Sequence, residues 1–320
     1  MEPIIEMRNL AKEKFRPLVL GLHKVGVRCG VSILPVHYYS ETPNVIELER
    51  DRPVWAKKSE LPGIPADLDQ QERNLKEVCL PYQQEYAGNP FYKEAVTQGF
   101  GPGYGYVEAQ ALYAMVRFLK PQTITEVGSG VSTFCMLAAA RANQSETGRM
   151  PTITCIDPFP SPKVRLLPQV KLLAEKVQQV AVEKFASLGP SDLLFIDSTH
   201  TVKPASDVNF LVLEVLPRLR SGVTVHFHDI HLPYDYQPDV LTTFYHWSET
   251  SLLRAFLINN SRAKIRFCLS QFHHERGDTL KRVFPEYSPE KFVGGLVDRS
   301  QGPLSQSHKH FPTSTYIDIL

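Results

Sequence analysis

Cysteine is scarce in this sequence, and no two cysteines are spaced to bind a metal together. The 320 residues contain five cysteines, an odd number, and none lies in a C-x-x-C pair. A disulfide framework or a zinc-finger site is therefore not expected. The pattern favours free thiols in a reducing, cytoplasmic compartment. The five are Cys29, Cys79, Cys135, Cys155 and Cys268.

An excess of charge and a long apolar run are also missing. Lys and Arg number 35 against 34 Asp and Glu, which gives a formal net charge of +1. Nucleic-acid binding usually needs a basic field, so nucleic acid is not an expected partner. The most apolar early stretch, residues 18–36, is interrupted by His23, Lys24 and Arg28, and the first residues lack a basic region. We therefore expect neither a membrane span nor a signal peptide.

The first hundred residues contain many prolines and few periodic runs, which predicts an irregular accessory region over residues 1–98. Within it, the apolar spacing at Asp67 to Val78 fits a short amphipathic helix, and Gly30 to Val36 fits a strand. The prolines that carry this prediction are Pro35, Pro43, Pro53, Pro62, Pro65, Pro81 and Pro90.

Regular alternation begins after a glycine-rich turn at residues 99–105 and predicts a domain over residues 99–299. Short β-branched runs alternate with helical stretches, which implies a mainly parallel sheet covered on both faces. The expected fold class is α/β, Rossmann-like and doubly wound. Strands are expected at Thr123–Val127, Thr152–Ile156, Lys171–Val177, Leu193–Asp197, Val223–His228 and Lys264–Leu269. Helices are expected at Val107–Leu119, Ser132–Arg141, Asp207–Leu219 and Trp247–Asn259.

The C-terminal part predicts a hairpin and a tail. Ala263 to Phe272 reads as the first arm of an antiparallel pair, and residues 292–298 read as its weak partner. The polar tail, residues 300–320, is expected to be loosely ordered or to pack on a second copy of the chain in a homo-oligomer.

In open α/β sheets, ligands bind beyond the carboxyl ends of the strands. The first strand ends in Glu126 and is followed by Gly128 and Gly130, where backbone can approach a ligand closely. Asp157 follows the second strand, where a carboxylate can accept both ribose hydroxyls of a nucleoside. The third small residue of a dinucleotide motif is replaced by Thr133, and Glu126 would repel a pyrophosphate. This argues against a nicotinamide oxidoreductase.

Four segments together resemble a class I S-adenosylmethionine-dependent methyltransferase, and more narrowly the family 24 methyltransferases. They are Glu126-Val-Gly-Ser-Gly, Ile156-Asp-Pro, Phe195-Ile-Asp-Ser-Thr-His200 and His226-Phe-His-Asp-Ile230. The resemblance implies a seven-stranded sheet, with the loop from Glu126 to Ser132 around the methionine part of the cofactor. It also implies Asp157 on the ribose, Gln178 near the adenine, and Asp197 on the methionine side facing the acceptor. The implied cofactor-binding residues are Glu126, Gly128, Ser129, Gly130, Ser132, Asp157, Gln178 and Asp197.

Asp197, His200, His228 and Asp229 follow strand ends that the fold places side by side, and they are the candidate catalytic residues. A histidine there could serve as the base for a protonated acceptor. Related enzymes hold Mg²⁺ with carboxylates at these two strand ends, so Asp197 and Asp229 are candidate ligands if a metal is needed. His228 stands where another oxygen ligand is common, which weakens the case for Mg²⁺.

The sequence thus favours a methyltransferase that acts on a small polar acceptor, such as a sugar or a natural-product intermediate. O-methylation is favoured over N-methylation. Two alternatives remain open at this stage. One is a non-catalytic, methyltransferase-like binding module, and the other is a metal-dependent hydrolase that uses the same Asp and His residues.

Overall fold

The computed structural model describes residues 2–32, 34, 36, 39–40, 42–101, 103–297 and 309–320. The chain divides into two compact units, Met1–Arg52 and Pro53–Leu320, which are described separately. Among the described residues, no helix combines the length and apolar character needed to span a membrane.

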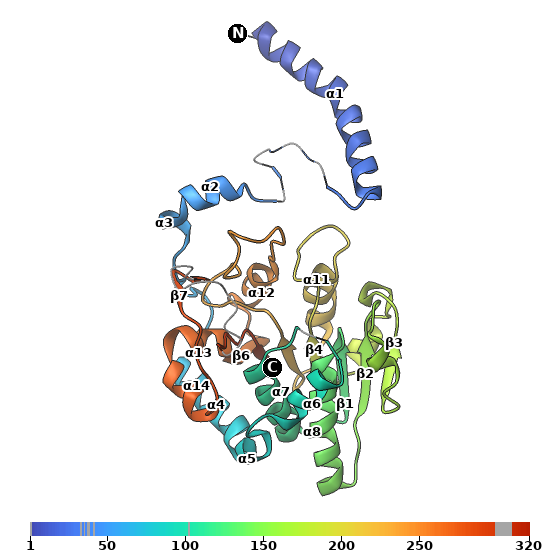
Figure 1. Ribbon diagram of the computed structural model, residues 1–320, viewed down its shortest axis with the longest axis vertical. Coiled ribbons are helices and arrows are strands. Elements are labelled where there is room, and N and C mark those ends of the chain that lie inside the picture. Colours follow the sequence, from blue (N-terminus) through green and yellow to red (C-terminus); the bar gives the residue numbers. More distant parts are fainter. Residues whose placement is uncertain are drawn as a thin grey trace. The chain divides into compact units, whose positions relative to one another are not determined.

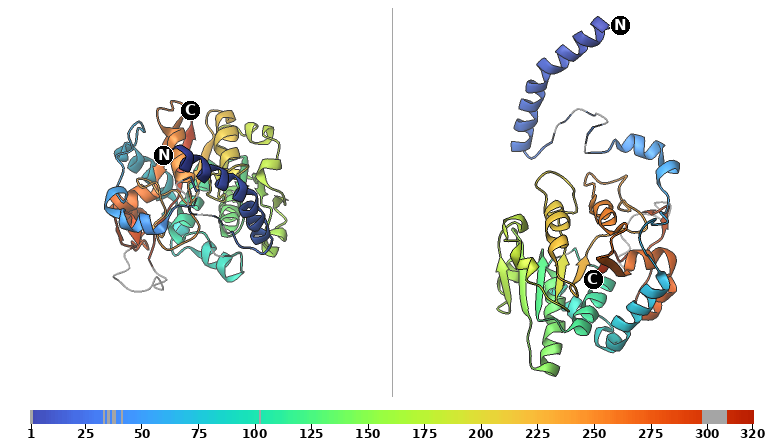
Figure 2. Two further views of the ribbon diagram at one scale, coloured as in Figure 1. Left: turned by 90° about the horizontal axis from the view of Figure 1, so that it is seen from above. Right: turned by 180° about the vertical axis from the view of Figure 1, so that it is seen from behind.

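The first unit is helical. α1 (Glu2–Arg28) is one long helix in both views of Figure 2, and α2 (Val45–Arg50) begins at Asn44, whose side chain accepts hydrogen bonds from two backbone amides. The expectation of irregular structure was therefore wrong here. The expected strand at Gly30–Val36 is also wrong for its described part, which has no regular structure, while residues 33 and 35 lie outside the described residues.

The second unit contains a seven-stranded sheet in the order β3-β2-β1-β4-β5-β9-β6 (Figure 1). The strands from β3 to β5 in that order pair in parallel, and β9 pairs antiparallel with both β5 and β6. This confirms the predicted Rossmann-like fold. The strands are β1 (Thr123–Val127), β2 (Thr152–Ile156), β3 (Val170–Leu173), β4 (Leu193–Ile196), β5 (Thr224–Phe227), β6 (Ala263–Cys268) and β9 (Thr315–Ile319).

The C-terminal part differs from the prediction, because β6 pairs with β9 and not with residues 292–298. β9 (Thr315–Ile319) lies between β5 and β6, so residues 309–320 are not a loose tail. Its Tyr316 is fully buried and stacks on His226 at 4.2 Å between ring centroids. Residues 292–297 instead pair with each other as β7 (Phe292–Val293) and β8 (Leu296–Val297), and residues 300–308 lie outside the described residues.

Helices cover both faces of the sheet and bury a separate apolar cluster on each. α4, α7 and α8 contribute to one cluster, and the residues 207–218 with α12 contribute to the other. The predicted amphipathic helix is present as α4, capped by the Asp67 side chain. The helices of the second unit and its boundary are α3 (Arg52–Trp55), α4 (Leu68–Cys79), η1 (Leu80–Tyr82), α5 (Gln83–Tyr86), α6 (Pro90–Thr97), α7 (Tyr106–Leu119), α8 (Val131–Thr147), α9 (Pro162–Arg165), η2 (Val177–Gln179), α10 (Glu183–Ala186), α11 (Asp207–Asn209), η3 (Phe210–Val215), η4 (Leu216–Arg218), α12 (Glu249–Leu257), α13 (Leu269–Glu275) and α14 (Gly277–Val283).

Candidate functional site

The carboxyl ends of β1, β4 and β5 bring the predicted site residues to one edge of the sheet. The parallel hydrogen-bond ladder continues one residue beyond each strand. Gly128 N donates to Ile156 O at 2.9 Å, Asp197 N to Val127 O at 2.9 Å, and His228 N to Ile196 O at 3.0 Å. The first residues of these loops are therefore held as firmly as the strands themselves.

The loop between β1 and α8 needs its glycines. Gly128 has φ +100°, and Gly130 has φ +151°, which side-chain-bearing residues rarely adopt. A Cβ at position 128 would stand 2.9 Å from the backbone oxygen of Asp197. The loop therefore lies directly against the end of β4.

Glu126 lies beneath this loop and is fully buried. Its two oxygens accept hydrogen bonds from Ser132 Oγ at 2.5 Å, Thr133 Oγ1 at 2.5 Å and Cys155 Sγ at 3.0 Å. Burial raises the pKa of Glu126 to about 7, although these hydrogen bonds act in the opposite direction. In this conformation Glu126 and Ser132 support the loop from below.

The raised pKa of Glu126 predicts a loss of stability with increasing pH. Its protonated form is favoured by folding, so the contribution is complete below about pH 4.5 and is lost as the pH rises through about 7. The shift corresponds to ~3 kcal/mol by pH 8. Glu126→Gln stays neutral and should lose less stability than the wild type between pH 5 and pH 8, as measured by urea unfolding.

The exposed Glu77→Gln variant is the matched control, because it removes a carboxylate from the surface of α4. It should keep the wild-type pH dependence. An unchanged pH dependence in Glu126→Gln would contradict the assigned protonation of the buried carboxyl.

Asp157 is half-buried at the end of β2 and is held by its own loop. Its Oδ2 accepts from Ser129 Oγ at 2.5 Å, and its Oδ1 accepts from Phe159 N at 2.7 Å. The second bond closes a turn, and each oxygen retains a further lone pair. Gln178, in η2 after β3, donates from Nε2 to Ala205 O at 2.9 Å.

Asp197, His200, His228 and Asp229 converge, as predicted, and form what we call the Asp-His cluster. Asp197 Oδ1 lies 3.4 Å from His200 Nε2 and 3.4 Å from His228 Nδ1. Asp229 Oδ2 lies 3.5 Å from each of the same two nitrogens. The imidazoles are buried, whereas the Asp197 and Asp229 side chains are 30% and 20% exposed, so the cluster is open on its carboxylate side.

Two further carboxylates contact the ring nitrogens of His200 and His228 that face away from Asp197 and Asp229. Glu249 Oε2 is 2.7 Å from His200 Nδ1, and Glu108 Oε1 is 3.4 Å from His228 Nε2. Both glutamates are buried. Each ring therefore presents its other nitrogen to the cluster, with His200 further held by the Trp247 ring at 4.7 Å between centroids.

His200 and Asp229 also have left-handed backbone conformations, with φ +57° and +56°. Such conformations cost roughly 1–3 kcal/mol for a residue other than glycine, and they concentrate at functional sites. Asp229 is fixed by Thr313 Oγ1, which donates to its Oδ1 at 2.9 Å from the segment before β9.

The carboxylates favour positive charge on both rings. Burial opposes the charged form of His200, but Asp197 and Glu249 outweigh it and raise the pKa of that imidazole to about 10. The pKa of His228 is raised as well, because Asp229, Glu108 and Asp197 together outweigh its burial. The protonated form of each ring is therefore favoured near neutral pH. A ring must lose this proton before it can accept one from an acceptor.

Two neighbouring histidines are not part of the cluster. His226 is fully buried between Phe195 and Tyr316, and burial lowers its pKa. His231 packs beside Trp247, its Nδ1 lies 3.0 Å from Asp229 O, and burial lowers its pKa to about 4. Both rings act as neutral packing groups.

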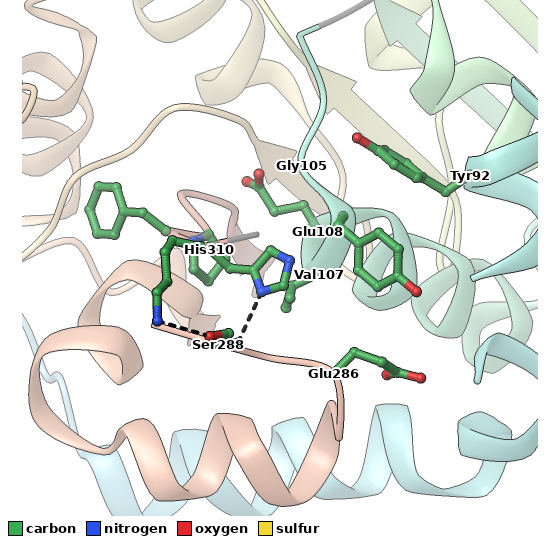
Figure 3. A pocket seen from close by; sticks show the side chains of 11 residues that line it. Tyr92, Gly105, Val107, Glu108, Glu286, Ser288 and His310 are labelled. Atoms are coloured by element: carbon green, nitrogen blue, oxygen red, sulfur yellow. Dashed lines mark hydrogen bonds between the residues drawn. The ribbon is translucent and has the colours of Figure 1, made fainter. Parts of the chain in front are cut away.

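A pocket of about 700 Å³ is lined in part by Glu108 (Figure 3). Figure 3 shows Tyr92, Glu108, Glu286 and His310 around it, with hydrogen bonds joining Ser288 to His310 and to Lys309. Glu108 lines this pocket and also faces His228 of the Asp-His cluster. Aromatic and polar groups together suit a small ligand with several hydroxyls.

The sequence did not indicate Glu249 or Thr313 as parts of the site. Glu249 begins α12, and Thr313 precedes β9, so both come from segments far along the chain. An acidic residue in the first turn of a helix is common for reasons of helix stability alone. No local signal could have separated Glu249 from such residues.

Comparison with known proteins identifies the class. Residues 125–230 match a family model described as a methyltransferase domain. No curated protein matches the chain. Residues 125–230 therefore form a methyltransferase domain, and the strand order agrees with the predicted class I fold. The motifs at Glu126, Asp157 and Asp197, on which that prediction rests, lie within the matched segment.

Several solved structures are similar at low identity. An apo structure of CmcI shares 17% identity over 50% of this chain (TM-score 0.31), and the chain spans 63% of that protein. The S-adenosylhomocysteine-bound Podospora anserina methyltransferase PaMTH1 shares 17% identity over 73% of this chain and 92% of its own (TM-score 0.35). The O-methyltransferase TomG from Streptomyces achromogenes, in complex with S-adenosylmethionine, shares 12% identity over 86% of this chain and 96% of its own (TM-score 0.37). These likenesses are too weak to carry the assignment, which rests on the family match and the sheet.

Proposed function

We propose that the protein transfers the methyl group of S-adenosylmethionine to a hydroxyl oxygen of a small polar acceptor, such as a sugar or a natural-product intermediate. The observation that carries this proposal is the convergence of the Gly128 loop, Asp157 and the Asp-His cluster at one edge of the sheet. A cofactor cradle and a polar acceptor site are thereby adjacent.

The residues fit the cofactor. Gly128 lets the loop lie directly against the end of β4, where its backbone is proposed to contact the methionine part, and Ser129 orients Asp157. The free lone pairs of Asp157 suit the two ribose hydroxyls. Gln178, after β3, is proposed to lie near the adenine, and Glu126 to hold the loop in shape.

Methyl transfer to a hydroxyl requires that the acceptor oxygen be positioned in line with the methyl carbon and lose its proton. When bound, S-adenosylmethionine supplies an electrophilic methyl group and a sulfonium charge that disfavours a charged imidazole nearby. The C–O bond forms as the C–S bond breaks, and S-adenosylhomocysteine leaves. His200 Nε2 and His228 Nδ1 face the cluster, and in the metal-free protein one of them is proposed to receive the proton.

The pocket beside Glu108 is proposed to hold the part of the acceptor remote from the methylated oxygen. Its lining supplies an amine at Lys309, a carboxylate at Glu286 and a hydroxyl at Ser288. A cytoplasmic location is part of the proposal, because all five cysteines are free thiols.

The test is calorimetric titration of metal-free protein with S-adenosylmethionine, S-adenosylhomocysteine and, as a control, NADH. Both sulfur ligands should bind, and NADH should not. Asp157→Ala should abolish that binding, because it removes both ribose acceptors. S-adenosylhomocysteine formation is then measured across a panel of sugars, phenols and amines.

Each outcome discriminates between the remaining alternatives. Failure of the wild type to bind either sulfur ligand, together with hydrolysis of a test ester or phosphate, would replace the methyltransferase by the metal-dependent hydrolase. Binding without turnover on any acceptor class would favour the non-catalytic module. Turnover on amines alone would correct the acceptor atom to nitrogen.

A further inference from the structure

The Asp-His cluster does not have the composition of a magnesium site. Mg²⁺ prefers oxygen ligands in octahedral geometry and keeps several waters. Here two ring nitrogens, His200 Nε2 and His228 Nδ1, alternate with two carboxylate oxygens. Imidazole nitrogen combined with carboxylate oxygen is a donor set typical of zinc and other first-row transition metals.

The N–O spacing of these atoms is close to that around such an ion. The four N–O separations are 3.4, 3.4, 3.5 and 3.5 Å. Ligand atoms about 2.0–2.1 Å from a tetrahedral zinc ion lie roughly 3.3–3.4 Å from one another. One ligand atom each from Asp197, His200 and His228 lies within 4.8 Å of the others. These three side chains are therefore close enough together to share an ion, and Asp229 lies beside both imidazoles.

The surroundings of His228 give an independent indication. Its Nδ1 is buried, faces the two aspartates, and has no hydrogen-bond partner among the described residues. A buried polar atom without a partner is costly, and natural proteins rarely leave one without a role. Nδ1 is positioned as a metal ligand would be, while Nε2 faces Glu108 on the other side of the ring.

Both histidines have the support that metal ligands usually have. A ligating histidine almost always gives its other ring N–H to a carboxylate or carbonyl, which fixes the ring and its tautomer. Glu249 does this for His200 at 2.7 Å, and Glu108 faces His228 Nε2 at 3.4 Å. The four carboxylates also exceed the two imidazoles in number, which favours the binding of a cation at the cluster.

We propose that Asp197, His200, His228 and Asp229 bind one divalent first-row transition-metal ion, of the Zn²⁺ class, in preference to Mg²⁺. The carboxylate side of the cluster is the open side, so an acceptor oxygen could approach the ion there. The metal site does not depend on which acceptor is methylated.

The test uses the full chain, stripped with a chelator and titrated separately with Zn²⁺ and Mg²⁺. The wild type should bind one equivalent of Zn²⁺, with a rise in Tm, and should not bind Mg²⁺ at the same concentrations. A Co²⁺-loaded sample should show the intense visible absorption of a low-coordinate ion. Absence of stoichiometric Zn²⁺ uptake, or equal uptake of Mg²⁺, would overturn the proposal.

Variants locate the ion. Glu249→Gln should weaken Zn²⁺ binding by about 10–100-fold, as outer-shell changes do, and His200→Ala and His228→Ala should weaken it by more. Asp278→Asn, an exposed carboxylate on α14, should bind like the wild type. Wild-type affinity in all the cluster variants would place the ion elsewhere. S-adenosylmethionine binding is measured on the metal-free protein, so the metal site and the proposed function can fail separately.

Discussion

Gly128→Ala is expected to weaken S-adenosylmethionine binding by ~10–10²-fold, which corresponds to ~1–3 kcal/mol of strain and displacement in the loop. The residue has φ +100°, and the new Cβ would meet Asp197 O at 2.9 Å. That oxygen belongs to backbone, so it cannot move away without shifting the end of β4. The measurement is calorimetric titration of the variant with S-adenosylmethionine.

Gly148→Ala is the matched control. Gly148 ends α8 with φ +73°, and a Cβ there meets nothing within 4 Å. The variant should lose roughly 1 kcal/mol of stability through backbone strain, as a glycine at a helix end does. Its affinity for S-adenosylmethionine should match the wild type. If Gly128→Ala also binds normally, the loop does not cradle the cofactor.

The sheet could be predicted from the sequence because most of its parallel strands are short apolar runs that are bounded by loops. The runs at Thr123–Val127 and Thr152–Ile156 match β1 and β2 residue for residue. Strands buried on both faces need such runs, so the signal is local and strong. The same logic placed Asp197 and His228 directly after strands that lie side by side.

The last strand could not be predicted in the same way. Residues 292–297 contain two consecutive glycines, Gly294 and Gly295, with φ +57° and +69°, which suit a tight turn between two short strands. They therefore pair with each other. β9 is selected instead by tertiary packing, since Tyr316 fills the space beside His226 and Phe267. A five-residue strand after a polar segment carries little local signal of that packing.

The candidate site was predictable where its residues follow strands, and not where they lie on helices. Asp197, His200, His228 and Asp229 follow β4 and β5, whose adjacency the fold dictates. Glu249, which was not predicted, lies at the start of α12. Whether a helix directs a given side chain toward the sheet edge depends on its rotation and tilt, which short-range sequence patterns do not determine.

His200→Ala is expected to lower kcat by ~10²–10⁴-fold, the usual contribution of a positioned acid or base, while the Kd for S-adenosylmethionine stays within a few-fold of the wild type. His200 belongs to the Asp-His cluster, and its Nε2 faces Asp197 and Asp229 at 3.4 and 3.5 Å. The measurement is S-adenosylhomocysteine formation at saturating cofactor, with the acceptor found in the screen.

His246→Ala is the control, because His246 precedes Trp247 in the same loop but its ring lies beside Val240. It should retain kcat. A His200→Ala enzyme that keeps full turnover would remove His200 from the reaction. Loss of cofactor binding in His200→Ala would mean that the ring supports the cofactor side of the site. The split between kcat and Kd thus separates a role in acceptor chemistry from a role in holding the loops together.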